Sequence, residues 1–200
     1  KGNINYYSEG NCIISFGKLI IGCKSSVIPQ EVTVIGEGAF QGCQGLERID
    51  SGDHVASLRG ITAIEDYAFM GCSSLKNVII PTSVVSIGEG AFDSCEALAT
   101  VSFSEAEHSK LKTIGKEAFA HCAVTSIRLP ASLTKIGVGA FLGDKINVSY
   151  LGTTDDWISG KINVCSAGEE DVNMYDRDYY DGLCNVICEA SDNATYLVRY

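Results

Sequence analysis

The chain has 200 residues, of which 46% are hydrophobic, and carries a formal net charge of -10 at pH 7. This length suffices for one compact domain or one short solenoid with a sizeable core. The acidic balance, without a long run of Lys or Arg, disfavours nucleic acid and anionic lipid as partners. No stretch reaches the roughly 18 to 20 apolar residues that span a bilayer, and we expect any export signal or anchor to lie outside this sequence.

Residues 1–33 are expected to form an N-terminal cap and a first coil. Within them, Cys12 and Cys23 flank the stretch "IISFGKLIIG", which is consistent with a hairpin around Gly17. A disulfide between the two cysteines stays an alternative. The odd total of nine cysteines argues against a fully oxidised framework.

An Ala-Phe pair recurs five times in residues 34–151, which we expect to be the repeat region. The phenylalanines are 22 to 29 residues apart, in or near the range of leucine-rich repeats. They are Phe40, Phe69, Phe92, Phe119 and Phe141. One such unit cannot bury its own apolar face, so we expect the units to stack with Phe over Phe in one continuous core.

Spacing within each unit is stricter than spacing between units. An Ile precedes each Phe by five residues, and Cys follows four of them by three. The isoleucines are Ile35, Ile64, Ile87, Ile114 and Ile136, and the cysteines are Cys43, Cys72, Cys95 and Cys122, with Asp144 in the fifth unit. Alternating apolar residues then predict a half-buried strand, which ends near Pro81 or Pro130 in two of the units. Each unit therefore reads as a strand, a turn, a short extended piece such as "VVSI", and a brief helical turn over "EGAFDSC".

Two polar insertions interrupt the repeat. They are "DSGDHVASLRG" after Ile49 and "SEAEHSK" after Phe103. Insertions of this kind cost little loop entropy, and repeat proteins often place binding surface in them.

The unit "LKNVIIPTSVVSIGEGAFDSC" resembles the leucine-rich repeats of BspA-like bacterial surface proteins, whose pattern is close to L-x-x-I-x-I-P-x-S-V-x-x-I-G-x-x-A-F-x-x-C. The resemblance covers about residues 11–157 and includes "YLGTTDDWISGKI", in which Trp157 would cover the last Phe layer. It implies a right-handed repeat solenoid, made mainly of short parallel β-strands with short helical turns. It also implies an exported or surface-attached protein that serves adhesion or partner binding, with no catalytic residues.

Residues 152–200 are expected to form a C-terminal capping region. "NVICEAS" at 185–191 echoes "NVIIPTS" at 77–83, which suggests a degenerate final coil. The acidic run at 171–183 offers Asp176, Asp178 and Asp181 as a weak calcium candidate. Tyr180 stands where the EF-hand template needs an oxygen ligand, so a solvated acidic loop is favoured.

The four repeat cysteines occupy one slot of successive coils and should form a column. Side chains in a column point the same way, so we interpret these thiols as reduced, small apolar fillers of the core. Disulfides between neighbouring coils stay open as an alternative. Zinc needs four ligands converging on one point, which a linear column does not offer.

Catalysis has little support in this sequence. It has three histidines, and no G-x-S-x-G, H-E-x-x-H or phosphate-binding Gly loop. His121 lies next to Cys122, yet adjacent side chains rarely face each other. We therefore predict neither an enzymatic activity nor a cofactor.

The outward positions of the long strands are the remaining candidate site. They present small polar groups with one aliphatic and one arginine side chain, although solvated strand positions would look the same. The candidates are Asn77, Ile79, Thr100, Ser102, Ser126 and Arg128, followed in the last unit by Asn147 and Ser149. The leading hypothesis is an extracellular or cell-surface module that binds a protein or glycan, and the alternative is a structural spacer that presents another domain.

Overall fold

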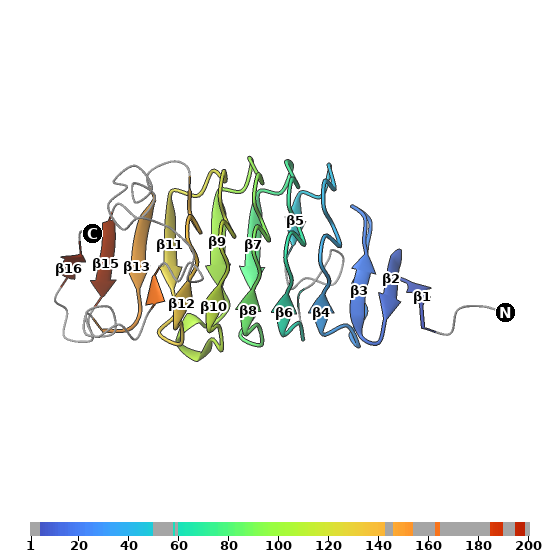
Figure 1. Ribbon diagram of the computed structural model, residues 1–200, viewed down its shortest axis with the longest axis horizontal. Coiled ribbons are helices and arrows are strands. Elements are labelled where there is room, and N and C mark those ends of the chain that lie inside the picture. The colour runs from blue at the N-terminus through green and yellow to red at the C-terminus, as the bar shows by residue number, and fades with distance from the viewer. Residues whose placement is uncertain are drawn as a thin grey trace, which may run out of the picture.

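The computed structural model of the chain describes residues 5–49, 58, 60–142 and 146–153, and the backbone of strands at 163–164, 185–189 and 195–198. The described residues form an elongated solenoid whose coils stack along the long axis (Figure 1). Strand β1 (Tyr7–Glu9) lies at one end, and β15 (Asn185–Glu189) and β16 (Thr195–Val198) lie at the other. The predicted repeat solenoid is confirmed, whereas the predicted boundaries at 33 and 151 stay predictions.

A nine-stranded sheet forms one side of the solenoid, with the strand order β1-β2-β3-β4-β6-β8-β10-β12-β14. The remaining bounds are β2 Cys12–Ser15, β3 Lys18–Ile21, β4 Val34–Ile35, β6 Ala63–Ile64, β8 Ser86–Ile87, β10 Thr113–Ile114, β12 Lys135–Ile136 and β14 Asn163–Val164. The first three strands are antiparallel, and all later neighbours are parallel. The five two-residue strands from β4 to β12 are the short extended pieces that the sequence predicts.

The opposite side carries the longer strands in two ladders. β5 (Arg48–Ile49), β7 (Asn77–Ile80) and β9 (Thr100–Phe103) form one, and β11 (Ser126–Leu129), β13 (Asn147–Tyr150), β15 and β16 form the other. Strands β9 and β11 lie side by side but belong to separate ladders (Figure 1). β15, which lies in the "NVICEAS" stretch, pairs in parallel with β13, and the capping region expected over residues 152–200 stays a prediction.

The repeated phenylalanines form a continuous stack through the core. Ring centroids of successive Phe residues are 5.0, 5.1, 5.1 and 5.7 Å apart from Phe40 to Phe141, with interplanar angles between 3° and 9°. Stacked aromatic pairs add stability beyond the apolar area that they bury. The buried apolar side chains of the described residues form one cluster that reaches from Cys12 to Tyr150.

Glycine in the motif "IG" is required by the distance between coils. A Cβ on Gly115 would overlap the Gly88 carbonyl carbon and lie 2.6 Å from the Glu89 amide nitrogen. A Cβ on Gly137 would similarly lie 2.7 Å from the Lys116 Cα. Successive backbones therefore pass too closely at this slot for any side chain.

The expected helical turn over "EGAFDSC" is wrong. Among the described residues, the only helix is the 3-10 helix η1 (Ala106–His108). In each of the first four units two positions around the Phe have positive φ, such as Gly90 at 53° and Ser94 at 57° on either side of Phe92. The Phe92 amide donates to the Ala118 carbonyl of the next coil at 2.8 Å, so bonds between coils replace bonds along a helix.

The expected hairpin around Gly17 is confirmed, since β2 and β3 pair in antiparallel orientation on either side of Phe16 and Gly17. Cys12 and Cys23 are both free thiols. Cys12 donates to the Gly10 carbonyl at 3.5 Å, whereas Cys23 lies 3.3 Å from the Ser25 hydroxyl. The disulfide alternative is therefore not realised in this structure.

Candidate binding face

Strands β7, β9, β11 and β13 position the candidate site. In each strand the first residue is exposed, the second and fourth are buried, and the third is exposed or half-buried. All predicted candidates therefore point outward. We call them the strand face: Asn77, Ile79, Thr100, Ser102, Ser126, Arg128, Asn147 and Ser149.

Parallel pairing aligns the strand face in two rows. Asn77 stands beside Thr100 and Ile79 beside Ser102 in the first ladder. Ser126 stands beside Asn147 and Arg128 beside Ser149 in the second ladder. Adjacent strands in a ladder lie about 4.8 Å apart. A ligand that lies across the strands therefore meets one outward side chain per strand, at this spacing.

The chemistry of the strand face is mainly that of hydroxyl and amide groups. Each Ser or Thr hydroxyl and each Asn amide can both donate and accept hydrogen bonds. Ile79 is half-buried and adds a small apolar area. Such a surface can hydrogen-bond a polar partner without a strong preference for its charge.

The second polar insertion lies beside the strand face. Arg128 Nη1 is 4.0 Å from Oε1 of Glu107, which belongs to η1 within "SEAEHSK". Both side chains are largely exposed, so solvent screening keeps this pair weak. The insertion still brings an acidic group next to the one arginine of the face. Most of the first insertion lies outside the described residues.

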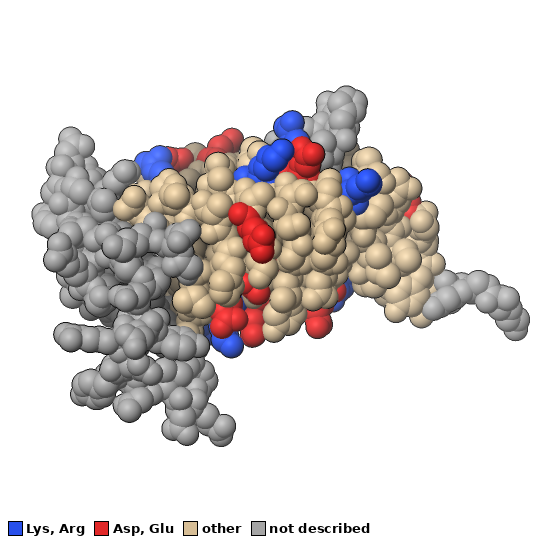
Figure 2. Space-filling model, turned by 90° about the horizontal axis from the view of Figure 1, so that it is seen from above, with Lys and Arg blue, Asp and Glu red and all other residues tan. Residues whose placement is uncertain are grey.

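Charged side chains are sparse on the edge of the solenoid that is seen from above. Figure 2 shows a largely uncharged surface on this edge, with an isolated acidic side chain near its middle and small groups of acidic and basic side chains along its rims. Among the ion pairs between neighbouring coils, Lys76 Nζ lies 3.2 Å from Glu47 Oε2. No single-sign patch therefore marks this view as a site for a polyion.

The cysteine column is confirmed as a packing feature, but the thiols also form hydrogen bonds that the sequence interpretation missed. Cys72 and Cys95 are fully buried, and Cys43 and Cys122 are half-buried. The thiols of Cys72, Cys95 and Cys122 each donate to a Phe carbonyl of the preceding coil, at 3.1, 3.2 and 3.2 Å respectively. A thiol in this slot therefore links coils as well as filling space.

The environment keeps the Cys95 and Cys122 thiols protonated, whereas a hydrogen bond with the Cys95 thiol lowers the pKa of the buried Cys72. Burial raises the pKa of Cys122 to about 12. A contact with the Cys72 thiol, together with burial, raises the pKa of Cys95. Since the thiolate is the reactive form of cysteine, Cys95 and Cys122 are poorly suited to nucleophilic chemistry.

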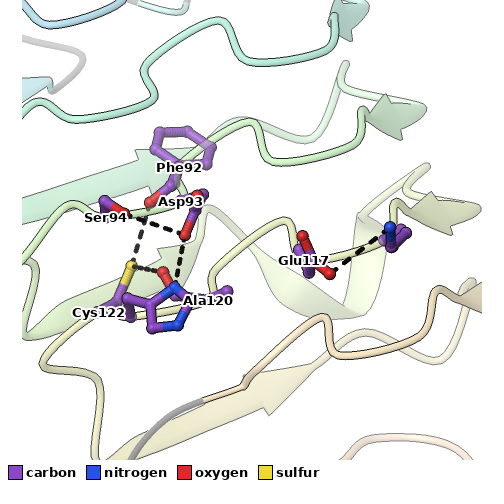
Figure 3. Close-up of polar contacts among 8 residues, drawn as sticks. Phe92, Asp93, Ser94, Glu117, Ala120 and Cys122 are labelled. Atoms are coloured by element: carbon purple, nitrogen blue, oxygen red, sulfur yellow. Dashed lines mark hydrogen bonds and ion pairs between the residues drawn. The ribbon is translucent and has the colours of Figure 1, made fainter.

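His121 and Cys122 bond to different partners. His121 Nδ1 lies 2.8 Å from Asp93 Oδ1 of the preceding coil, whereas the Cys122 thiol points to the Phe92 and Ala120 carbonyls (Figure 3). The imidazole is therefore held by a carboxylate at the surface, and the thiol lies against backbone. His121 and Asp93 therefore form a polar pair between neighbouring coils at the surface.

Metal ligands do not gather within the part of the chain that the structure describes: no group of three or more His, Cys, Asp or Glu residues there can hold an ion. The calcium candidate Asp176, Asp178 and Asp181 lies outside the described residues. So does Trp157, the predicted cover of the last Phe layer.

Sequence reasoning overlooked the exposed apolar residues of the N-terminal hairpins. Tyr6, Tyr7 and Phe16 are exposed at 51%, 43% and 86%. A signal was present, because "SFGK" places an aromatic residue in a two-residue turn that normally favours Asn-Gly.

The repeat architecture agrees with a family model. The model of the BspA type leucine rich repeat region matches six copies over residues 16–147. The chain belongs to the BspA-type leucine-rich repeat family. Proteins of this family are bacterial cell-surface proteins, as the resemblance of the motif implies. Comparison with curated protein sequences gave no match.

Solved structures share the BspA-type fold. The pneumococcal vaccine antigen PcpA is 22% identical over 73% of this chain and 38% of its own, with a TM-score of 0.56. A leucine-rich repeat protein from Bacteroides ovatus is 27% identical over 76% and 39%, with a TM-score of 0.52. One from Eubacterium ventriosum is 20% identical over 89% and 54%, with a TM-score of 0.53.

The BspA-type chain spans only part of these relatives, 38% of PcpA and 39% of the Bacteroides ovatus protein. The likeness therefore concerns the repeat architecture. Across the described ranges, no helix is long and apolar enough to cross a membrane.

Proposed function

We propose that this BspA-type chain is a non-catalytic binding module of a bacterial surface protein, and that its strand face contacts a protein or a glycan on a host or neighbouring cell. The observation that carries the proposal is the alignment of the outward residues. Thr100 and Asn77 share one row, and each is followed by a fully or nearly fully buried residue, Val101 or Val78. A rigid core therefore holds the polar groups in fixed positions.

Preorganisation is the physical reason that such a surface can bind. Short Ser, Thr and Asn side chains have few rotamers to lose, and the parallel ladder fixes their spacing. Repeat solenoids commonly use this kind of extended surface for recognition. The proposal includes an extracellular or cell-surface location, and no nucleic acid or membrane insertion.

An array screen tests the proposal. The labelled chain would be applied to immobilised extracellular-matrix proteins and to a glycan array, beside the triple variant Asn77→Ala, Thr100→Ala, Arg128→Ala. We expect binding to at least one class of probe and a loss of about tenfold or more in the variant.

The matched control instead changes the residues that directly precede β4, β6 and β10 of the nine-stranded sheet, with Thr33→Ala, Thr62→Ala and Lys112→Ala, all of which are exposed. It should retain binding. If no probe binds, or if both triple variants lose binding equally, the strand face is not the site. The first of those results would favour the alternative, a structural spacer that presents another domain.

A further inference from the structure

The N-terminal hairpins carry most of the large apolar side chains that the described residues expose. Seven such side chains are exposed, and six of them lie between residues 6 and 27: Tyr6, Tyr7, Ile13, Phe16, Ile21 and Val27. The seventh, Val85, belongs to a later coil. An apolar surface confined to one end of a folded chain marks a contact site.

Phe16 is held in an unfavourable backbone conformation as well as being exposed. Its φ is 47° and that of Gly17 is 73°, as in a type I′ turn, where a bulky side chain is rare. Burial in the chain's own core does not offset this cost, because the side chain is 86% exposed. A strained and exposed aromatic residue points to a role outside the folded chain itself.

Strand β1 has an open edge. It is the first strand of the nine-stranded sheet and, among the described residues, has a neighbour on one side only. The turn at Gly10 and Asn11 makes the flanking Glu9 and Cys12 a hydrogen-bonded pair. Because such pairs alternate along antiparallel strands, the Ser8 N–H and C=O point away from β2 and toward the open edge.

Charge favours contact between copies at this end of the molecule. The whole chain has a net charge of -10, so two copies repel each other in general. Residues 5–33, by contrast, contain two lysines and two glutamates, Lys18, Lys24, Glu9 and Glu31, whose formal charges cancel. The N-terminal end therefore has no net charge of its own to oppose self-association.

We propose that two copies of this chain associate through β1, which would pair with β1 of the second copy in antiparallel orientation. Twofold symmetry makes such an interface self-complementary. With Tyr7 on the axis, Ser8 lies opposite Tyr6 of the second copy, and their outward backbone groups exchange hydrogen bonds. The exposed aromatic side chains of both copies then cover one another. This inference does not depend on the proposed function of the strand face.

Sedimentation equilibrium of the whole chain across a concentration series tests the proposal. We expect a reversible dimer. Tyr7→Lys should weaken it roughly tenfold or more, since like charges directly opposite each other on paired strands repel. Val85→Lys is the matched control, because Val85 and Tyr7 are exposed at 41% and 43%. It should leave the dimer unchanged.

A second variant removes the hydrogen bond rather than the side-chain contact. Ser8→Pro deletes the outward N–H while leaving the β1–β2 ladder intact, because edge strands accept proline at such positions. It should also abolish most of the association. In the unmodified chain, hydrogen exchange of the Ser8 amide should slow as concentration rises, which locates the interface at β1.

Three outcomes would overturn the proposal. The chain could remain monomeric throughout the series, the dimer could survive both Tyr7→Lys and Ser8→Pro, or Val85→Lys could weaken it equally. A monomeric chain whose Ser8 amide is protected only by an added extended peptide would assign the edge to a different protein, which also contradicts self-association.

Discussion

Single residues of the motif each meet a distinct physical requirement. Gly115 has no side chain because the neighbouring backbone occupies that space. Gly71 has positive φ, at 70°, in a turn where an added Cβ would meet nothing closer than 3.8 Å. Cys95 supplies both apolar volume and a donor to the Phe69 carbonyl. The recurrence of these residue types follows from the stacking of coils.

A substitution at Gly71 measures the cost of the left-handed backbone conformation without a steric clash. Gly71→Ala should lower the free energy of unfolding by about 1 kcal/mol, because an L-residue with a Cβ disfavours positive φ and no clash adds to the cost. Gly71→Asn should cost less, since Asn tolerates this region better than Ala. Urea unfolding of the two variants measures the difference, and equal or reversed costs would contradict this reading.

Thiol reactivity should separate the cysteines by environment. Hydrogen bonds from Ser25 lower the pKa of Cys23, so its reactive thiolate forms at lower pH than an ordinary thiol. The raised pKa and full burial of Cys95 keep it as an unreactive thiol. Peptide-resolved alkylation of the native chain should therefore modify Cys23 quickly and Cys95 only after unfolding. Rapid native labelling of Cys95 would refute its role in the core.

The alternation of inward and outward residues could be predicted from sequence, but the thiol bonds could not. Each S–H donor and its acceptor are far apart in the chain, 26 residues for Cys95 and 30 for Cys122. Which carbonyl a thiol meets depends on the register between coils of unequal length. Spacing within one unit contains no information on that register.

At the level of secondary-structure elements, the sequence predicted the strands of the repeat unit correctly and its helical turn wrongly. Period-two alternation and proline correctly predicted long strands such as β7 and β11. The predicted helical turn failed because positive φ at Gly90 and Ser94 interrupts a helix on both sides of Phe92. Composition alone did not show that Ser94 or His121 would occupy a position that usually belongs to glycine.

Close packing between coils makes Gly115 far less replaceable than Gly71. Gly115→Ala should lower the free energy of unfolding by about 3 kcal/mol or more, since the new Cβ overlaps the backbone of the preceding coil and forces the coils apart. Gly71→Ala serves as the control with no clash. A cost for Gly115→Ala that is no larger than that of Gly71→Ala would contradict the proposed contact.

The whole molecule combines a predictable stack with ends and junctions that sequence did not predict. Five units at short period sufficed to predict one core with Phe over Phe. The separation of the β9 and β11 ladders was not predicted. It coincides with the "SEAEHSK" insertion after β9 and with Pro130 after β11, which has no N–H to donate. The apolar cap was also missed, because periodicity describes repeated units rather than an irregular end.

The central claim is that the motif builds the stack and the strand face binds. Its most direct test compares two double variants of small hydroxyl residues on adjacent coils. One is Thr100→Arg with Ser126→Arg on the strand face, and the other is Thr33→Arg with Thr62→Arg, just before β4 and β6 of the nine-stranded sheet. Binding isotherms would use the strongest probe from the array screen. We predict that the strand-face variant weakens binding about tenfold or more while the other binds as the unmodified chain does. Undiminished binding by the strand-face variant would contradict the account.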